Sequence, residues 1–107
     1  MTVILNSAVR GAGHTGQIIT FGRRNSSEVV DLTAATITGT IRDTVTNVTR
    51  AIAGTLSGSG ITGLITWTYG AGDIGTAGKY DVQFKATYGD ATYELSYVTG
   101  WEVVEAL

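Results

Sequence analysis

Four acidic side chains in the second half of the chain have the chemistry of calcium ligands. Calcium binds when about six to eight oxygen atoms converge, so two loops would have to bring these carboxylates together. The four acids are Asp73, Asp81, Asp90 and Glu94. Their spacing in the sequence does not match a calcium-loop motif. We therefore interpret them as solvated turn acids, and the sequence predicts no metal ion and no cofactor.

A catalytic centre is also hard to assemble from these residue types. A hydrolytic triad needs a histidine base beside a nucleophile, and the chain has one histidine and no cysteine. We interpret that histidine, His14, as a solvated residue at the entry to a strand. The glycines between Gly11 and Gly16 have the spacing of a phosphate-binding loop, but the lysine, the preceding strand and the following helix are missing. We expect a protein that is not an enzyme.

Aromatic rings near the C-terminus are the remaining candidates for ligand binding. They belong to Tyr88, Tyr93, Tyr97 and Trp101. If they were exposed together, they would form a platform for a sugar, and the chain would be a carbohydrate-binding or host-adhesion module. Their alternation instead favours the core or a subunit contact. The carbohydrate alternative predicts that Tyr93, Tyr97 and Trp101 are exposed.

Composition limits the classes of protein to which the chain can belong. At 107 residues, with 43% hydrophobic and 15% charged, it has the size and composition of one folded domain. A net charge of -2 argues against general nucleic-acid binding, which needs a basic face. The N-terminal apolar patch is too short for a signal peptide, and no apolar run approaches the roughly 20 residues of a membrane span. We expect a soluble protein without a membrane or nucleic-acid partner.

The clearest structural signal is a strand from Tyr80 to Tyr88. Apolar and polar side chains alternate along it without a break, which is typical of a half-buried strand. The preceding Asp73–Gly78 segment leads into Tyr80 like the corner of an immunoglobulin-like sandwich, in which a tyrosine hydroxyl returns to upstream backbone.

Other short strands follow from the same pattern. We expect them at residues 17–22, 36–42, 61–69, 92–97 and 101–107, with a weak, irregular strand within 46–56. A helix over 45–53 is the minority alternative. We also expect a turn at 58–60, a two-residue hairpin turn at Gly89-Asp90, and Trp67 filling the gap beside Gly39. The chain is thus predicted to be an all-β, immunoglobulin-like antiparallel β-sandwich of about seven strands.

The first 13 residues are predicted to be an arm, followed by the sandwich at 14–107. Val3, Ile4 and Leu5 form an apolar patch, and Gly11 and Gly13 then interrupt the pattern. Such an arm either folds back on its own sheet or lies along the edge of a neighbour by strand addition. For the second case these three residues are the predicted partner-binding residues, and deletion of residues 2–12 is expected to leave the fold intact.

Three segments of the chain resemble the immunoglobulin-like domains at the N-terminus of phage baseplate upper proteins and of related tailed-phage virion proteins. The segments are residues 30–37, residues 63–67, and Asp73 together with residues 76–84. The resemblance covers about residues 14–104. The sequence departs from the family at Tyr88-Gly89-Asp90, where an aspartate-glycine turn is more usual. In the family this domain is also usually followed by further chain, whereas this sequence stops at Leu107.

The resemblance implies a non-enzymatic virion component that docks on other phage virion proteins through sheet edges and loops. A baseplate or tail accessory role and a head-decoration role both fit it, and both place the protein in the virion, assembled in the host cytoplasm. A homodimer, a homotrimer and a monomer that oligomerises only on the particle all fit the composition.

Overall fold

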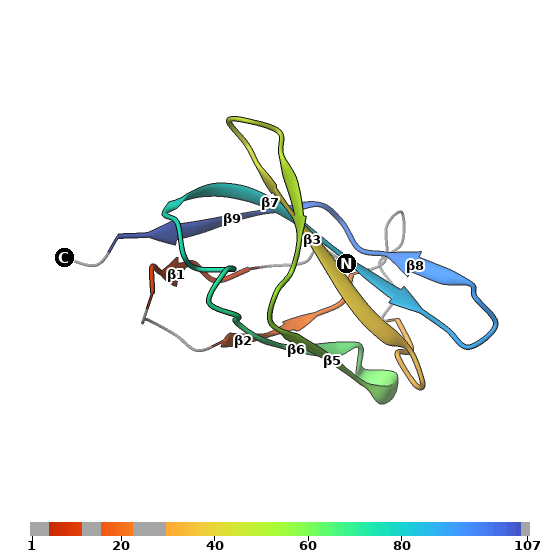
Figure 1. Cartoon of the computed structure of the whole chain (residues 1–107). Helices are drawn as coiled ribbons and strands as arrows, with labels where there is room; N and C mark the ends of the chain where they lie inside the picture. Colours follow the sequence, from red (N-terminus) through yellow and green to blue (C-terminus); the bar gives the residue numbers. More distant parts are fainter. Residues whose placement is uncertain (1–4, 12–15, 23–29, 106–107) are drawn as a thin grey trace.

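The computed structural model describes residues 5–11, 16–22 and 30–105, and its regular structure is nearly all β (Figure 1). Two sheets pack as a sandwich, which confirms the predicted fold class. The described residues form nine strands instead of about seven, because the strand Ala8–Val9 was not expected and the single weak strand expected within 46–56 forms two strands. The one helix among the described residues is η1, a three-residue 3-10 helix at Gly60–Thr62. No helix of the described residues is long and apolar enough to cross a membrane.

The larger sheet has the strand order β1-β9-β7-β3-β4, with β8 also paired to β7. Its strands are β1 (Ala8–Val9), β3 (Thr36–Asp43), β4 (Thr49–Ala51), β7 (Gly78–Thr87), β8 (Tyr93–Leu95) and β9 (Thr99–Val104). All pairs are antiparallel except β1 with β9, which is parallel. The long central strands β3 and β7 pair over eight residues and hold this sheet together.

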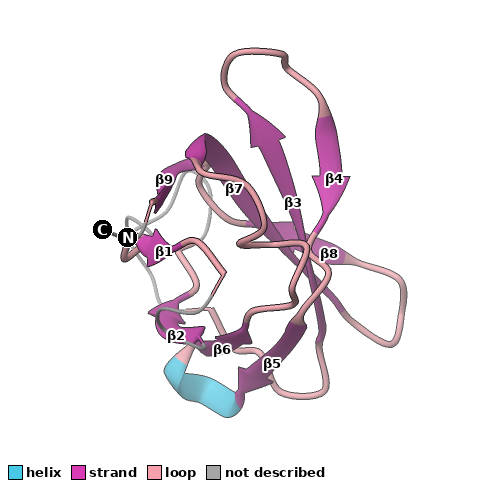
Figure 2. Cartoon of the chain, turned by 60° about the vertical axis from the view of Figure 1, so that its left-hand side comes forward, coloured by secondary structure: helices cyan, strands magenta, loops and turns pink. Residues whose placement is uncertain are grey.

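The smaller sheet has the order β2-β6-β5 and is antiparallel throughout. Its strands are β2 (Gly16–Thr20), β5 (Thr55–Ser59) and β6 (Leu64–Thr68). One sheet therefore contains the central trio β3, β7 and β9, and the other contains β2, β6 and β5. This is the strand arrangement of an immunoglobulin-like sandwich. Figure 2 shows the two sheets facing one another and the β3–β4 hairpin extending beyond them.

The core lies between the sheets and follows the alternation seen in the sequence. Tyr80, Val82, Phe84 and Ala86 of β7 are all buried. Trp67 of β6 is fully buried among other rings, with centroids 4.7 Å from Trp101 and 5.9 Å from Phe84. Clustered rings of this size contribute much of the apolar area that stabilises a small sandwich.

The corner before β7 forms as predicted. The hydroxyl of Tyr80 donates a hydrogen bond to the backbone oxygen of Thr76, at 2.8 Å. This bond ties the start of β7 to the loop that precedes it, and it satisfies the polar end of a ring that is otherwise buried.

The gap at Gly39 is filled differently from the prediction. A Cβ atom at this position would overlap the side chain of Ile52 and press on the ring of Phe84, whereas Trp67 is not among its nearest neighbours. Ile52 directly follows β4, and its N–H group donates to the backbone oxygen of Gly39 at 3.0 Å. The prediction was wrong because it required knowing that the weak segment 46–56 folds back against β3.

Three local predictions also need correction. The segment 46–56 is divided between the two sheets, since β4 pairs with β3 and β5 pairs with β6; the minority helix over 45–53 is not formed. Gly58 belongs to β5 and does not start a turn. The hairpin after β7 has a three-residue loop, because Tyr88 pairs with Thr92 and Ala91 adopts a φ of 69°. A left-handed third residue is typical of three-residue hairpins.

Candidate functional site

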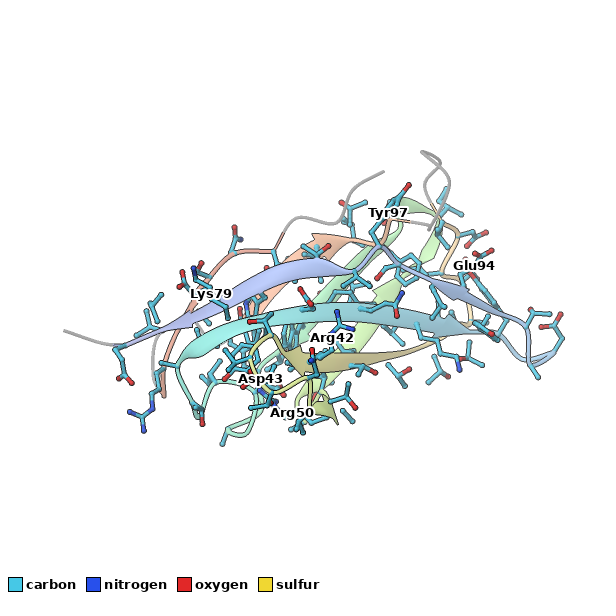
Figure 3. The ribbon with its side chains drawn as sticks, turned by 90° about the horizontal axis from the view of Figure 1, so that it is seen from above. Arg42, Asp43, Arg50, Lys79, Glu94 and Tyr97 are labelled. Carbon is cyan, nitrogen blue, oxygen red and sulfur yellow. The ribbon has the colours of Figure 1, made fainter. Side chains whose placement is uncertain are left out.

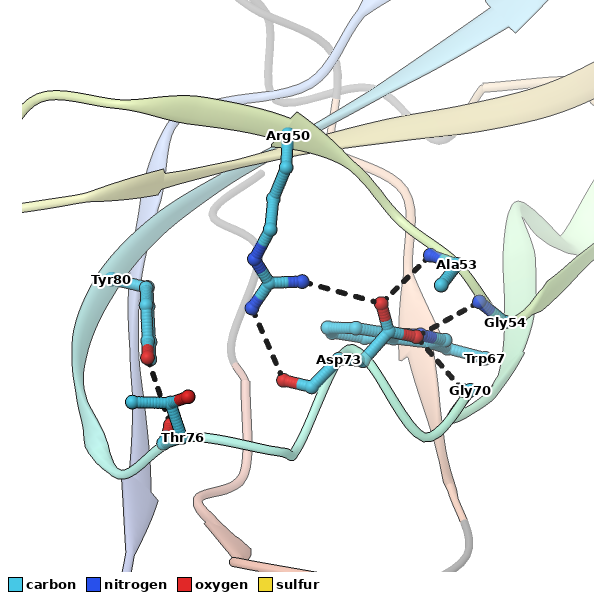
Figure 4. A network of polar contacts seen from close by, with 8 residues as sticks. All are labelled: Arg50, Ala53, Gly54, Trp67, Gly70, Asp73, Thr76 and Tyr80. Carbon is cyan, nitrogen blue, oxygen red and sulfur yellow. Dashed lines mark hydrogen bonds and ion pairs between the residues drawn. The ribbon is translucent and has the colours of Figure 1, made fainter.

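Asp73 is fully buried, so its interpretation as a solvated turn acid was wrong (Figure 4). One carboxylate oxygen accepts a hydrogen bond from the N–H of Ala53 at 2.7 Å. The other accepts from Gly54 and Gly70, both at 2.9 Å, and from the indole of Trp67 at 3.3 Å. Protein donors therefore occupy both oxygens of this carboxylate.

The guanidinium group of Arg50 completes this network. It lies 3.6 Å from a carboxylate oxygen of Asp73, donates to the backbone oxygen of Asp73 at 3.3 Å, and sits 5.5 Å from the ring centroid of Tyr80. The network joins the β4–β5 crossover to the β6–β7 loop. With its donors and its counterion supplied by the chain, this acid has a structural role.

The other three acids do not converge with it. Asp81 forms an ion pair with Arg42 at 2.7 Å. Asp90 accepts from the N–H and hydroxyl of Thr92, at 3.1 and 2.6 Å, and these bonds lower its pKa. Glu94 lies apart in β8. Within the part of the chain that the structure describes, no group of three or more His, Asp or Glu side chains could hold a metal ion.

The aromatic residues do not form a shared platform. Trp101 is buried against Trp67, and its indole donates to the backbone oxygen of Asn6 at 2.9 Å. Tyr93 is exposed and lies under the ammonium group of Lys85, 4.4 Å from the ring centroid. Tyr88 and Tyr97 are half-buried. Of the two predicted roles, the core is thus correct for Trp101 and wrong for Tyr93, for which a subunit contact remains a prediction.

The described part of the predicted arm folds back on its own domain. β1 pairs with β9, Ala8 is fully buried, and Leu5 packs against the core. The side-chain amide of Gln17 forms two hydrogen bonds with the backbone of Asn6, accepting from its N–H group at 2.8 Å and donating to its backbone oxygen at 3.0 Å.

These contacts change the expectations for the arm. Deletion of residues 2–12 would remove β1 and leave buried polar groups without partners, so we no longer expect the fold to stay intact. Leu5 is engaged in the core of its own chain. Val3 and Ile4, like His14, lie outside the described residues, so a partner-binding role of these two residues remains a prediction.

The strands differ sharply in charge between the two sheets. Those of the smaller sheet contain no charged residue, whereas those of the larger sheet contain Arg42, Asp43, Arg50, Lys79, Asp81, Lys85, Glu94 and Glu102. Figure 3 shows five of these side chains spread over β3, β4, β7 and β8. Among the strand residues, charge is therefore confined to the larger sheet.

The outer face of the smaller sheet is a neutral surface with an apolar corner. Ile18 is 66% exposed and Leu64 is 38% exposed, and they lie diagonally across the β2–β6 pair. Ile61, three residues before Leu64, is 76% exposed. Around them stand the exposed hydroxyl side chains of Thr55, Ser57, Thr66 and Thr68. We call these outward-facing sheet residues, together with Ile61 in the adjoining 3-10 turn η1, the neutral face.

The neutral face was not predicted from the sequence, although its strands share one feature. Residues 16–20, 55–59 and 64–68 all lack Asp, Glu, Lys, Arg and His. The three stretches are far apart in the chain, and their common membership of one sheet becomes visible only in the fold.

Comparisons of the chain with protein-family models, with curated proteins and with solved structures give no match.

Proposed function

We propose that this chain is a non-enzymatic structural component of a tailed-phage virion, which docks on other virion proteins through its neutral face. The observation that carries the proposal is the absence of charge from the strands of the smaller sheet together with the exposure of Ile18, Ile61 and Leu64. The centres of protein–protein interfaces are depleted of charged side chains, because a charge buried there must find a partner.

The physical argument is a comparison of the two sheet faces. A partner that covers the larger sheet must desolvate ion pairs such as Arg42–Asp81. A partner that covers the neutral face removes three large apolar side chains from water and meets hydroxyl groups that can be satisfied by neutral donors and acceptors. The second process costs less desolvation free energy, so the smaller sheet is the better docking surface.

The resemblance in residues 30–37, in residues 63–67, and in Asp73 together with residues 76–84 supplies the class of partner. These segments provide the buried Val30 and Leu32, the core ring Trp67 and the corner at Tyr80. The proposal includes a baseplate or tail accessory role and a head-decoration role, with the virion as the location. The carbohydrate-binding alternative requires Tyr93, Tyr97 and Trp101 to be exposed together; Tyr93 is exposed but Trp101 is a core residue, so this alternative has less support.

The test is co-sedimentation of the purified chain with particles of the phage that encodes it. We expect the wild-type chain to sediment with the particles and Ile18→Lys to stay in the supernatant, because a charge would be buried in the contact. The matched control is Thr36→Lys, an exposed position on the outer face of β3, which should bind like wild type. A chain that ignores every particle protein, or equal binding by Ile18→Lys, contradicts the proposal.

A further inference from the structure

β4 is the terminal strand of the larger sheet, and no strand formed by the described residues pairs with its outer side. The backbone N–H group of Asp43 donates to the backbone oxygen of Val48 at 3.0 Å. The backbone N–H group of Ile52 donates to the backbone oxygen of Gly39, also at 3.0 Å. Backbone groups alternate in direction along a strand. The peptide groups of residues 48, 50 and 52 therefore face β3, and those of Thr49 and Ala51 face away from the sheet.

β4 is only three residues long, but its outer edge has no proline, no lysine and no bulge that would block pairing with another chain. Exposed edges are normally blocked by proline, by lysine or by a bulge. Thr49 and Ala51 are small, neutral and exposed, and the chain contains no proline. The neighbouring hairpin tip also exposes two apolar side chains, with Val45 87% and Val48 65% exposed.

We propose that β4 pairs antiparallel with β4 of a second copy of this chain, across a two-fold axis at Arg50. In this register Thr49 stands opposite Ala51 of the second copy, and Ala51 stands opposite its Thr49. The two outward N–H groups and two outward oxygens of each strand then form four hydrogen bonds. On the inner side of the sheet, Val48 gains a neighbour in Ile52 of the second copy.

The charge of Arg50 does not oppose this pairing. The two Arg50 residues would stand opposite one another at the axis, where like charges normally destabilise a pair of strands. Each guanidinium group, however, runs beneath its own sheet to Asp73 and Tyr80, away from the free edge (Figure 4). Each is thus neutralised within its own chain, and the groups that meet at the axis are neutral.

The strand that pairs with the free edge of β4 is β4 of a second copy of this chain, because the edge is complementary to itself. Small neutral residues meet small neutral residues, each donor meets an acceptor, and an exposed valine meets an isoleucine that already packs beside Gly39. The contact is smaller than the roughly 800 Å² per partner of a stable interface, so the dimer forms only at high concentration. This pairing uses a different sheet from the proposed docking on virion proteins and does not depend on it.

The test is the mass of the purified chain by sedimentation equilibrium between about 10 µM and about 1 mM, the range of weak association. We expect the mass to rise toward twice that of one chain. Ala51→Pro removes an outward N–H group and leaves the bonds to β3 in place, so it should stay monomeric. The matched control Ala51→Thr keeps the N–H group and should dimerise like wild type.

A second measurement covers the case in which Ala51→Pro does not fold. Amide hydrogen exchange of Thr49 and Ala51 in the wild-type chain should slow by at least tenfold as the concentration rises, while exchange in β5 stays unchanged. Wild type that remains monomeric at the highest concentration overturns the proposal. So does a dimer in which these two amides exchange at the monomer's rate, because that dimer would use another surface.

Discussion

At the scale of single residues, Asp73 gives the clearest energetic prediction. Asp73→Asn keeps the shape of the side chain but removes its charge and turns one acceptor oxygen into a donor that faces N–H groups. We expect the free energy of unfolding to fall by about 3 kcal/mol, since a buried donor and Arg50 lose their partner. Urea denaturation followed by tryptophan fluorescence measures this loss.

The control for this variant is Asp90→Asn in the β7–β8 hairpin. Its amide oxygen can accept the same two hydrogen bonds from Thr92 in a fully exposed turn. Its denaturation midpoint should lie close to that of wild type. An Asp73→Asn midpoint that also stays at the wild-type value would show that the network does not stabilise the fold.

The phenol of Tyr69 makes the stability of the fold depend on pH in the alkaline range. Burial raises the pKa of this phenol, and hydrogen bonds from Gln17 and Trp101 lower it by less. The unfolded chain therefore releases this proton at a lower pH than the folded chain. Stability is fully present below about pH 10 and is lost as the pH rises through the folded pKa.

The corresponding prediction compares wild type with Tyr69→Phe. Between about pH 8 and about pH 11 the free energy of unfolding should fall less in the variant, because it lacks the phenol whose pKa is raised in the folded chain. All other ionisable groups are the same in the two proteins, so their contributions cancel in the comparison. Equal losses in the two proteins would contradict the assignment.

At the scale of elements, the contact between β3 and the residue after β4 can be tested by a double-mutant cycle. Gly39→Ala should destabilise the fold by about 1–3 kcal/mol, because its Cβ atom overlaps Ile52. Ile52→Val removes the overlapping methyl group, so the double variant should recover at least about 0.5 kcal/mol relative to additivity. Chemical denaturation of the four proteins measures the coupling.

Gly100→Ala is the matched strand glycine for this cycle, since a Cβ atom at Gly100 meets no atom within 4 Å. Its stability should equal or slightly exceed that of wild type. Additive effects of the changes at Gly39 and Ile52 would show that the two residues do not press on each other.

Elements whose signal is local in sequence could be predicted, whereas the contacts between distant elements could not. The alternation of β7 and the corner at Tyr80 are contained within a dozen residues, and both predictions were confirmed. Asp73 was misjudged because its donors come from residues 53, 54, 67 and 70, which meet only after the β4–β5 crossover changes sheets. The neutral face could not be predicted for the same reason, since its three strands become neighbours only when the chain folds.

At the scale of the whole molecule, the separation of charge between the sheets predicts how docking responds to salt. Screening weakens contacts between charges and leaves apolar burial intact. Binding to virion particles through the neutral face should therefore change less than about twofold between about 50 mM and about 500 mM sodium chloride. A steep loss of binding with salt, measured by the same co-sedimentation, would assign the contact to the charged sheet.

The position of the lysines has a practical consequence for experiments on immobilised protein. The chain has two lysines, Lys79 and Lys85, and both lie on β7, on the outward side of the larger sheet. Amine coupling through either side chain to a sensor chip would attach the molecule by its charged side. The opposite surface, with Ile18 and Leu64, would then face the flowing sample.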